Sequence, residues 1–107
     1  MEHRTLIVAK MDHDDADAVA AIFAESDATD LPHLIGVKRR SLFRFHGLYF
    51  HLVEAEQGIQ QGLYKARAGS ALYSDINTKL ARYMTPYDPN WAEPKDSMAE
   101  QFYRWEA

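Results

Sequence analysis

The stretch that decides the fold runs from Leu34 to Ala55 and reads LIGVKRRSLFRFHGLYFHLVEA. Up to Phe45, the apolar side chains fall mainly at every second position, which is the period of a half-buried β-strand. Gly47 then marks a tight turn, and the residues after it alternate again as far as Ala55. The stretch therefore predicts a β-hairpin.

The length of the turn decides which side chains share a face of this hairpin. If the loop consists of His46 and Gly47 alone, Leu42 lies opposite His51, and Arg40 becomes a diagonal neighbour of His51 on the same face. A loop of three residues would shift the register and separate these two side chains. The convergence of Arg40 and His51 is thus conditional on a two-residue turn.

The segments on either side of the hairpin complete a simple order of elements. Before it we expect a strand over 4–11 and a helix that starts in the acidic run 12–17 and ends at Asp30-Leu31-Pro32. After it we expect a helix over 57–84, with a possible break at Gly69-Ser70, and a last strand over 98–105.

The resulting order, βαββαβ, closes most simply into an α+β, ferredoxin-like sheet with two helices on one face. Such a small domain leaves the other face of its sheet uncovered, and that face carries aromatic side chains. A homodimer that packs sheet against sheet, as in a dimeric α+β barrel, is the economical way to cover it.

Composition limits the remaining possibilities. The 107 residues are 47% hydrophobic and 26% charged, which is ordinary for one folded domain spanning 1–107. There is no cysteine, which excludes a disulfide framework, a thiolate zinc site and a cysteine nucleophile. No export signal and no run of about 18 apolar residues is present, so we expect a cytoplasmic protein that does not enter membranes.

The net charge of −4 is unevenly distributed. Between Leu31 and Val53 there is no acidic residue, whereas Lys38, Arg39, Arg40 and Arg44 are cationic. The window therefore carries +4 and the rest of the chain −8. Because Asp27 is expected to end a helix where this basic strand begins, Asp27, Arg40 and His51 can converge on one pocket.

Each of these three residues also has a plainer interpretation that the sequence leaves open. His51 can be a structural histidine in an apolar strand, and Arg40 can belong to a solvated run of cations. Asp27 can bond to backbone amides at the end of its helix.

Two other kinds of site are disfavoured. His33, His46 and His51 have neither the spacing of helical metal ligands nor a carboxylate nearby in sequence, so we expect no metal. The same order of elements builds RNA-binding domains, but only Gly47 and Phe50 match their aromatic strand motif, and the net negative charge opposes phosphate binding. We therefore expect no nucleic-acid partner.

Two sequence motifs indicate a family, which the periodicity of the chain alone does not. The segments G-V-x-R-R-x-L-F-R-F-H, over 36–46, and Y-x-H-L, over 49–52, resemble those of the small aromatic polyketide cyclases. Leu63–Arg67, Tyr83–Tyr87 and the residues around Trp91 and Lys95–Ser97 support this resemblance, which extends over nearly the whole chain.

The resemblance implies a ferredoxin-like homodimer that needs no metal or organic cofactor. Members of the family close and dehydrate a ring in a partly cyclised polyketide made by a type II polyketide synthase. It implies that the catalytic acid–base groups are Asp27, Arg40 and His51. A family member has a histidine beside the aspartate where this chain has Ser26, so any role of that position is open.

The chemistry of these residue types agrees with ring closure by an aldol reaction. A histidine with a pKa of about 6.5 can remove a proton from a methylene between two carbonyls. Arg40 would stabilise the enolate, and Asp27 would orient the histidine or share the return of the proton. For substrate binding we expect Phe43, Tyr49, Phe50, Trp105 and Arg44.

Two alternatives remain at this stage. The same fold hosts cofactor-independent monooxygenases of polycyclic aromatics, in which a substrate carbanion reacts with oxygen. In the second alternative, the chain is a non-catalytic subunit that only shapes a polyketide within a synthase complex.

Overall fold

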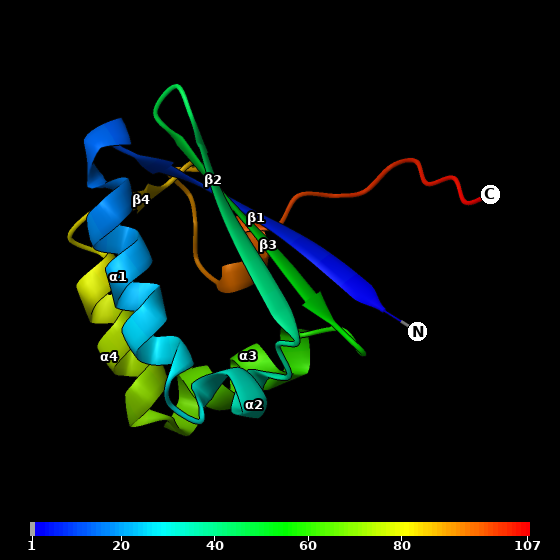
Figure 1. Cartoon of the computed structure of the whole chain (residues 1–107), viewed down its shortest axis with the longest axis horizontal. Coiled ribbons are helices and arrows are strands. Elements are labelled where there is room, and N and C mark those ends of the chain that lie inside the picture. The colour runs from blue at the N-terminus through cyan, green and yellow to red at the C-terminus, as the bar shows by residue number, and fades with distance from the viewer. Residues whose placement is uncertain (1) are drawn as a thin grey trace.

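A computed structural model describes residues 2–107 and contains a four-stranded sheet covered on one face by helices (Figure 1). The elements are, in chain order, β1 (His3–Met11), η1 (His13–Asp15), α1 (Ala16–Asp27), α2 (Leu31–Ile35), β2 (Arg39–Phe45), β3 (Leu48–Ala55), α3 (Gln60–Gly69), α4 (Ala71–Leu80), β4 (Met84–Pro86) and η2 (Pro94–Ser97). The strand order is β2-β3-β1-β4, and every pair is antiparallel. The ferredoxin-like α+β fold is confirmed.

The hairpin has the two-residue turn on which the site prediction depends. His46 and Gly47 both have positive φ angles, of 47° and 77°, as a tight hairpin turn requires. Leu42 consequently pairs with His51, and Arg40 pairs with Val53. The predicted register is confirmed, and Arg40 and His51 lie on the same face of the sheet.

The helical segments agree with the sequence in outline and differ in detail. The predicted helix over 57–84 is broken where expected, because Gly69 ends α3 and the Ser70 hydroxyl caps α4 by accepting a bond from the Tyr73 amide. The predicted strand over 34–45 begins only at Arg39. Residues 31–35 form the short helix α2 instead, which tolerates Pro32 in its first turn and ends at Gly36 with a φ of 94°.

The prediction of a last strand over 98–105 is wrong. The fourth strand is Met84–Pro86, and beyond it only Met98 forms an isolated bridge, to Ile7 of β1. Residues 99–107 have no regular structure, and Figure 1 shows them extending away from the sheet. The tail begins to pair with the edge of β1 that β4 leaves open, through the Met98 bridge and a bond from the Ala99 amide to the Leu6 carbonyl, but the pairing does not continue.

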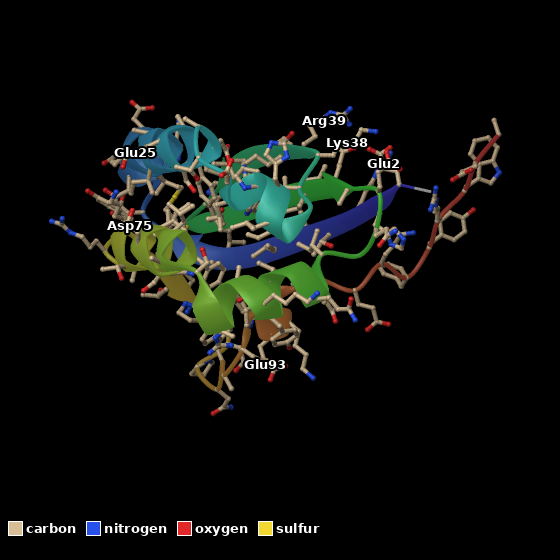
Figure 2. All side chains as sticks on the ribbon, turned by 90° about the horizontal axis from the view of Figure 1, so that it is seen from below. Glu2, Glu25, Lys38, Arg39, Asp75 and Glu93 are labelled. Atoms are coloured by element: carbon tan, nitrogen blue, oxygen red, sulfur yellow. The ribbon has the colours of Figure 1, made fainter. Side chains whose placement is uncertain are left out.

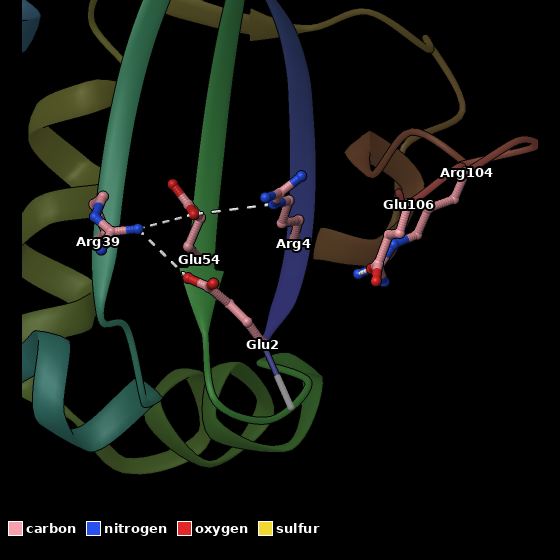
Figure 3. A network of polar contacts seen from close by, with 6 residues as sticks. All are labelled: Glu2, Arg4, Arg39, Glu54, Arg104 and Glu106. Carbon is pink, nitrogen blue, oxygen red and sulfur yellow. Dashed lines mark hydrogen bonds and ion pairs between the residues drawn. The ribbon is translucent and has the colours of Figure 1, made fainter.

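The two faces of the sheet differ sharply. One face packs against the helices, and the core there includes Met11, Val19, Phe23, Leu31, Tyr49, Ile76 and Leu80. The other face, called here the open face, is uncovered: Phe43 and Phe45 of β2 are 55% and 61% exposed. A polar network of Arg4, Glu2, Arg39 and Glu54 lies at one end of the open face (Figure 3).

Within residues 2–107 no helix is long and apolar enough to cross a membrane.

Candidate active site

A cavity of about 580 Å³ lies between the sheet and the helices. Its walls are mostly apolar and come from all four strands, from all four α-helices, and from the segment after β4. Among the residues that line it in the described part of the chain there is no carboxylate, and the only cations are Arg40 and Arg67. An apolar cavity with a few polar groups is the usual form of a small-molecule site.

Arg40 and His51 meet at this cavity. Nη1 of Arg40 lies 2.9 Å from Nε2 of His51. Both side chains line the cavity, and both project from the helix-facing side of neighbouring strands. The hairpin register thus brings together the two residues that the sequence predicted to be diagonal neighbours.

Asp27, the last residue of α1, completes a chain of three polar side chains. Its carboxylate accepts from Nε of Arg40 at 2.9 and 3.0 Å and lies 2.8 Å from Nη2. This two-nitrogen geometry is the strong, planar form of an arginine–carboxylate pair. We call Asp27, Arg40 and His51 the polar relay.

His51 sits in an apolar and aromatic environment. The ring of Phe23 lies 5.1 Å away and that of Tyr49 6.1 Å away, both edge-on, and the Arg40 guanidinium lies 5.0 Å from the centre of the Phe23 ring. Burial, with a smaller contribution from the positive charge of Arg40, lowers the pKa of His51 from 6.5 to about 3. The expectation of an ordinary histidine pKa is therefore corrected, and His51 is neutral near pH 7. Burial also raises the pKa of Tyr49.

The bond to Arg40 determines which nitrogen of His51 carries the proton. A guanidinium can only donate, so Nε2 of the neutral ring must accept and Nδ1 must carry the hydrogen. Among residues 2–107 the structure gives His51 a hydrogen bond at Nε2 alone. Because His51 lines the cavity, its Nδ1–H is the ring hydrogen that can donate to a bound molecule.

The five residues expected to bind substrate have different positions. Tyr49 lines the cavity. Phe43 and Phe50 pair with each other on the open face, because residues of opposite parity to Arg40 and His51 point away from the helices. Arg44 shares the parity of Arg40 but lies outside the cavity wall, where it donates to the backbone carbonyl of His13. Trp105 is 72% exposed in the C-terminal tail.

Three further cavity residues were missed by sequence reasoning. Tyr73 and Arg67 reach the cavity from α4 and α3, and Trp91 reaches it from the segment after β4. The helical period could have predicted the position of Arg67, because Arg67 follows the cavity residue Leu63 by four positions and so lies on the same side of α3. Ser26, next to Asp27, also lines the cavity.

Metal-binding residues do not cluster in the described chain: residues 2–107 contain no group of three or more histidine, cysteine, aspartate or glutamate side chains that could hold an ion. His33 and His46, considered above with His51, do not line the cavity.

Comparison with known proteins points to one class of enzyme. A family model described as polyketide synthesis cyclase matches residues 3–106. The chain is 52% identical to tetracenomycin F2 cyclase of Streptomyces glaucescens, covering 100% of this chain and 97% of that protein. It is 43% identical to polyketide synthase CurG of Streptomyces cyaneus, covering 97% of each.

Solved structures agree on the fold. The structure of the Streptomyces glaucescens cyclase, described as a type II polyketide cyclase, matches with a TM-score of 0.91 over 98% of both chains. A protein from Nitrosomonas europaea, named as an antibiotic biosynthesis monooxygenase, matches with a TM-score of 0.56 over 82% of both chains. Its identity is only 12%, so this second likeness concerns the fold alone.

Proposed function

The chain belongs to the family of polyketide synthesis cyclases, and on this premise we propose that the polar relay promotes closure and dehydration of an aromatic polyketide ring. The protein is an aromatic polyketide cyclase, an enzyme that performs an intramolecular aldol reaction. The observation that carries the proposed mechanism is the contact of Arg40 with both Asp27 and His51 at the wall of the cavity.

The cavity suits a planar substrate rich in carbonyl groups. Its volume of about 580 Å³ is in the ordinary range for small-molecule sites. Apolar walls accommodate fused rings, and the absence of lining carboxylates in residues 2–107 avoids repulsion of negative charge that develops on oxygen. A type II polyketide synthase would supply such a substrate.

In this reaction the nucleophile is a carbon atom of the substrate and not a side chain of the protein. A methylene between two carbonyls enolises readily, and the enol carbon attacks a second carbonyl carbon of the same molecule. One carbon–carbon bond forms, and the attacked carbonyl oxygen becomes negatively charged. That oxygen takes up the proton that the enol loses, and the hydroxyl then leaves as water together with a proton from the adjacent carbon, which makes the ring aromatic.

The relay acts at the oxygen that becomes negative. The Nδ1–H of neutral His51 donates to it, and Arg40 retains N–H groups that its bonds to Asp27 and His51 do not use. Fixed donors directed at a developing oxyanion lower the barrier, since they are already oriented before the charge appears. Asp27 holds the guanidinium in place and compensates its charge.

This role differs from the general base expected from the sequence. With a pKa of about 3, His51 is a weak base in the free protein, and its Nε2 lone pair is already occupied by Arg40. A neutral imidazole that donates a hydrogen bond requires no such basicity. The cavity adds a second contribution, because it folds the flexible substrate so that one pair of carbons meets. Variants of the relay should therefore be slow but form the same ring.

We also propose that two copies of the chain associate through their open faces. The support is the exposure of Phe43 and Phe45 there, together with the 96%, 75% and 72% exposure of Phe102, Tyr103 and Trp105 in the tail. Apolar surface of this kind is costly in water. A second copy would cover the open face by a self-complementary contact and would give the tail aromatics a surface to pack on.

A direct test uses a reactive polyketide precursor that cyclises slowly by itself. The purified protein should accelerate the formation of one cyclised product, and at the same rate under nitrogen as in air. A requirement for oxygen would indicate the monooxygenase chemistry considered above. Unchanged product output with His51→Ala and with Arg40→Gln, but not without the protein, would indicate a subunit that only shapes the polyketide.

A further inference from the structure

The second cation of the cavity, Arg67, has no part in the mechanism above. It projects from α3 and forms part of the cavity wall together with Trp91. Its guanidinium lies 5.7 Å from the centre of the Trp91 ring, and its Nη2 donates to the carbonyl oxygen of Ala92 at 3.3 Å. Within residues 2–107 it forms no ion pair with a carboxylate, unlike Arg40.

Arg67 and Trp91 lie at the other end of the cavity from the polar relay. Arg40 belongs to β2, which is one edge of the sheet, whereas Trp91 follows β4, the opposite edge. Figure 2 shows this separation: labelled Arg39 of β2 is at one side of the sheet, and labelled Glu93 is at the far side, below α3. Glu93 accepts a bond from Tyr64 and so fastens this segment to α3.

A guanidinium stacked near an indole and bonded to one carbonyl keeps most of its five N–H donors available. Its rigid fork matches two oxygens that share one negative charge, and the indole offers a flat apolar surface beside it. Such a pair recognises an aromatic or conjugated group that ends in an anion.

We propose that Arg67 and Trp91 form an anchoring site for the end of the polyketide that does not react. Trp91 contacts the conjugated part of the substrate, and Arg67 binds a pair of oxygens that carries one negative charge, either a carboxylate or the enolate of a 1,3-diketone. Anchoring this end fixes how far the substrate enters the cavity and hence which carbonyl reaches His51. Arg67 is thus a positioning residue, and the inference rests on the proposed function.

Binding of small probes tests this site without catalysis. We would measure the affinities of naphthoate, naphthamide and naphthoylacetone for wild-type protein and for Arg67→Gln by calorimetry. The probe whose two oxygens share a negative charge should bind about tenfold more weakly to the variant, because one charge-assisted contact is lost. The affinity for naphthamide should change by less than about twofold. A loss confined to naphthoate identifies a carboxylate, and one confined to naphthoylacetone identifies a diketone enolate; either supports the site.

Matched variants separate recognition from structure. Lys65→Gln removes an exposed cation from the same helix, outside the cavity wall, and should leave all three affinities unchanged. Trp91→Leu should lower the affinities for naphthoate and naphthamide to similar extents, because it removes the surface that both probes contact. If Arg67 only held the segment after β4 in place, Arg67→Gln would lower the affinities for naphthoate and naphthamide equally.

Turnover gives the second measurement. With a polyketide precursor, Arg67→Gln should raise KM by about tenfold and leave kcat within about twofold, since the anchor is made before and during the reaction alike. Equal affinities of wild type and Arg67→Gln for every probe, in a protein that does cyclise the precursor, would overturn the anchoring site and leave the cyclase mechanism intact. Failure of the wild type to cyclise any precursor would instead contradict the proposed function.

Discussion

Nη1 of Arg40 lies 2.9 Å from Nε2 of His51, so a side chain that is always positively charged donates to the lone pair of a buried histidine. Protonation of His51 would remove that acceptor and bring two cations together in an apolar environment. Burial and the pair with Arg40 therefore keep His51 neutral, and its Nδ1–H stays free of Arg40. Both stability and catalysis should reflect this arrangement.

Stability should fall in acid because of His51. Its pKa is about 3 in the folded protein and near 6.5 when unfolded, so between these values the unfolded chain binds the extra proton. Lowering the pH through this window thus favours unfolding. From about pH 7.5 to about pH 4.5, His51 alone should cost roughly 2–3 kcal/mol of unfolding free energy.

Urea unfolding of wild type and His51→Gln at both pH values measures this contribution. The glutamine side-chain oxygen can still accept from Arg40 but does not titrate. The acid-induced loss should therefore be smaller in the variant, while the carboxylates contribute equally to both proteins. Equal losses would show that the pKa of His51 is close to its ordinary value.

Activity should be insensitive to His51 titration near neutrality. If His51 acts as a neutral donor, lowering the pH from about 8 to about 5 should change kcat/KM of the wild type and of His51→Gln in the same way. A histidine with an ordinary pKa would give a limb near pH 6.5. A profile of kcat/KM against pH for the two proteins decides between these outcomes.

Asp27→Asn should slow ring closure more than it destabilises the fold. The amide retains the shape of the side chain and one oxygen that can accept from Arg40, but it loses the second acceptor and the charge that compensates the guanidinium. We expect kcat to fall about tenfold, and unfolding free energy to fall by about 1 kcal/mol, because the pair is partly exposed. Asp30→Asn is the control, since it changes an exposed aspartate a few residues further along. Similar kcat values for both variants would exclude a role of Asp27 in the relay.

Phe43→Asp should dissociate the proposed dimer. A charge on the open face would be buried without a partner, so the dimer dissociation constant should rise by more than about tenfold. Leu34→Asp is a matched control, because Leu34 is 56% exposed, as Phe43 is at 55%, but lies on α2. Sedimentation velocity gives the oligomeric state; a wild-type monomer, or a Phe43→Asp dimer of unchanged strength, would contradict the proposal.

Local pattern was enough to predict the centre of the site. The pair His46-Gly47 permits a two-residue turn, and the period of two then fixes which residues face the helices. The meeting of Arg40 with His51 follows from that register. The same parity places Phe43 and Phe50 on the open face, outside the wall of the cavity, so contact of these two residues with the substrate stays a prediction.

Features that depend on distant contacts were not predictable in this way. The pKa of His51 is set mainly by the helices that bury it, which no residue in its own strand reveals. Residues 98–105 alternate like a strand, but they leave the edge of β1 after the bridge at Met98 and the bond from the Ala99 amide to Leu6. Arg67 and Trp91 meet only because the segment after β4 returns against α3.

The central claim is that Arg40, held by Asp27, stabilises the transition state of ring closure together with His51. It is tested most directly by the initial rate of cyclisation with Arg40→Gln, alongside Arg39→Gln, which alters the neighbouring residue on the opposite face of β2. We predict a fall of about 100-fold in kcat for Arg40→Gln, with the same product, and a change of less than about twofold for Arg39→Gln. A folded Arg40→Gln variant that closes the ring at the wild-type rate would contradict the account.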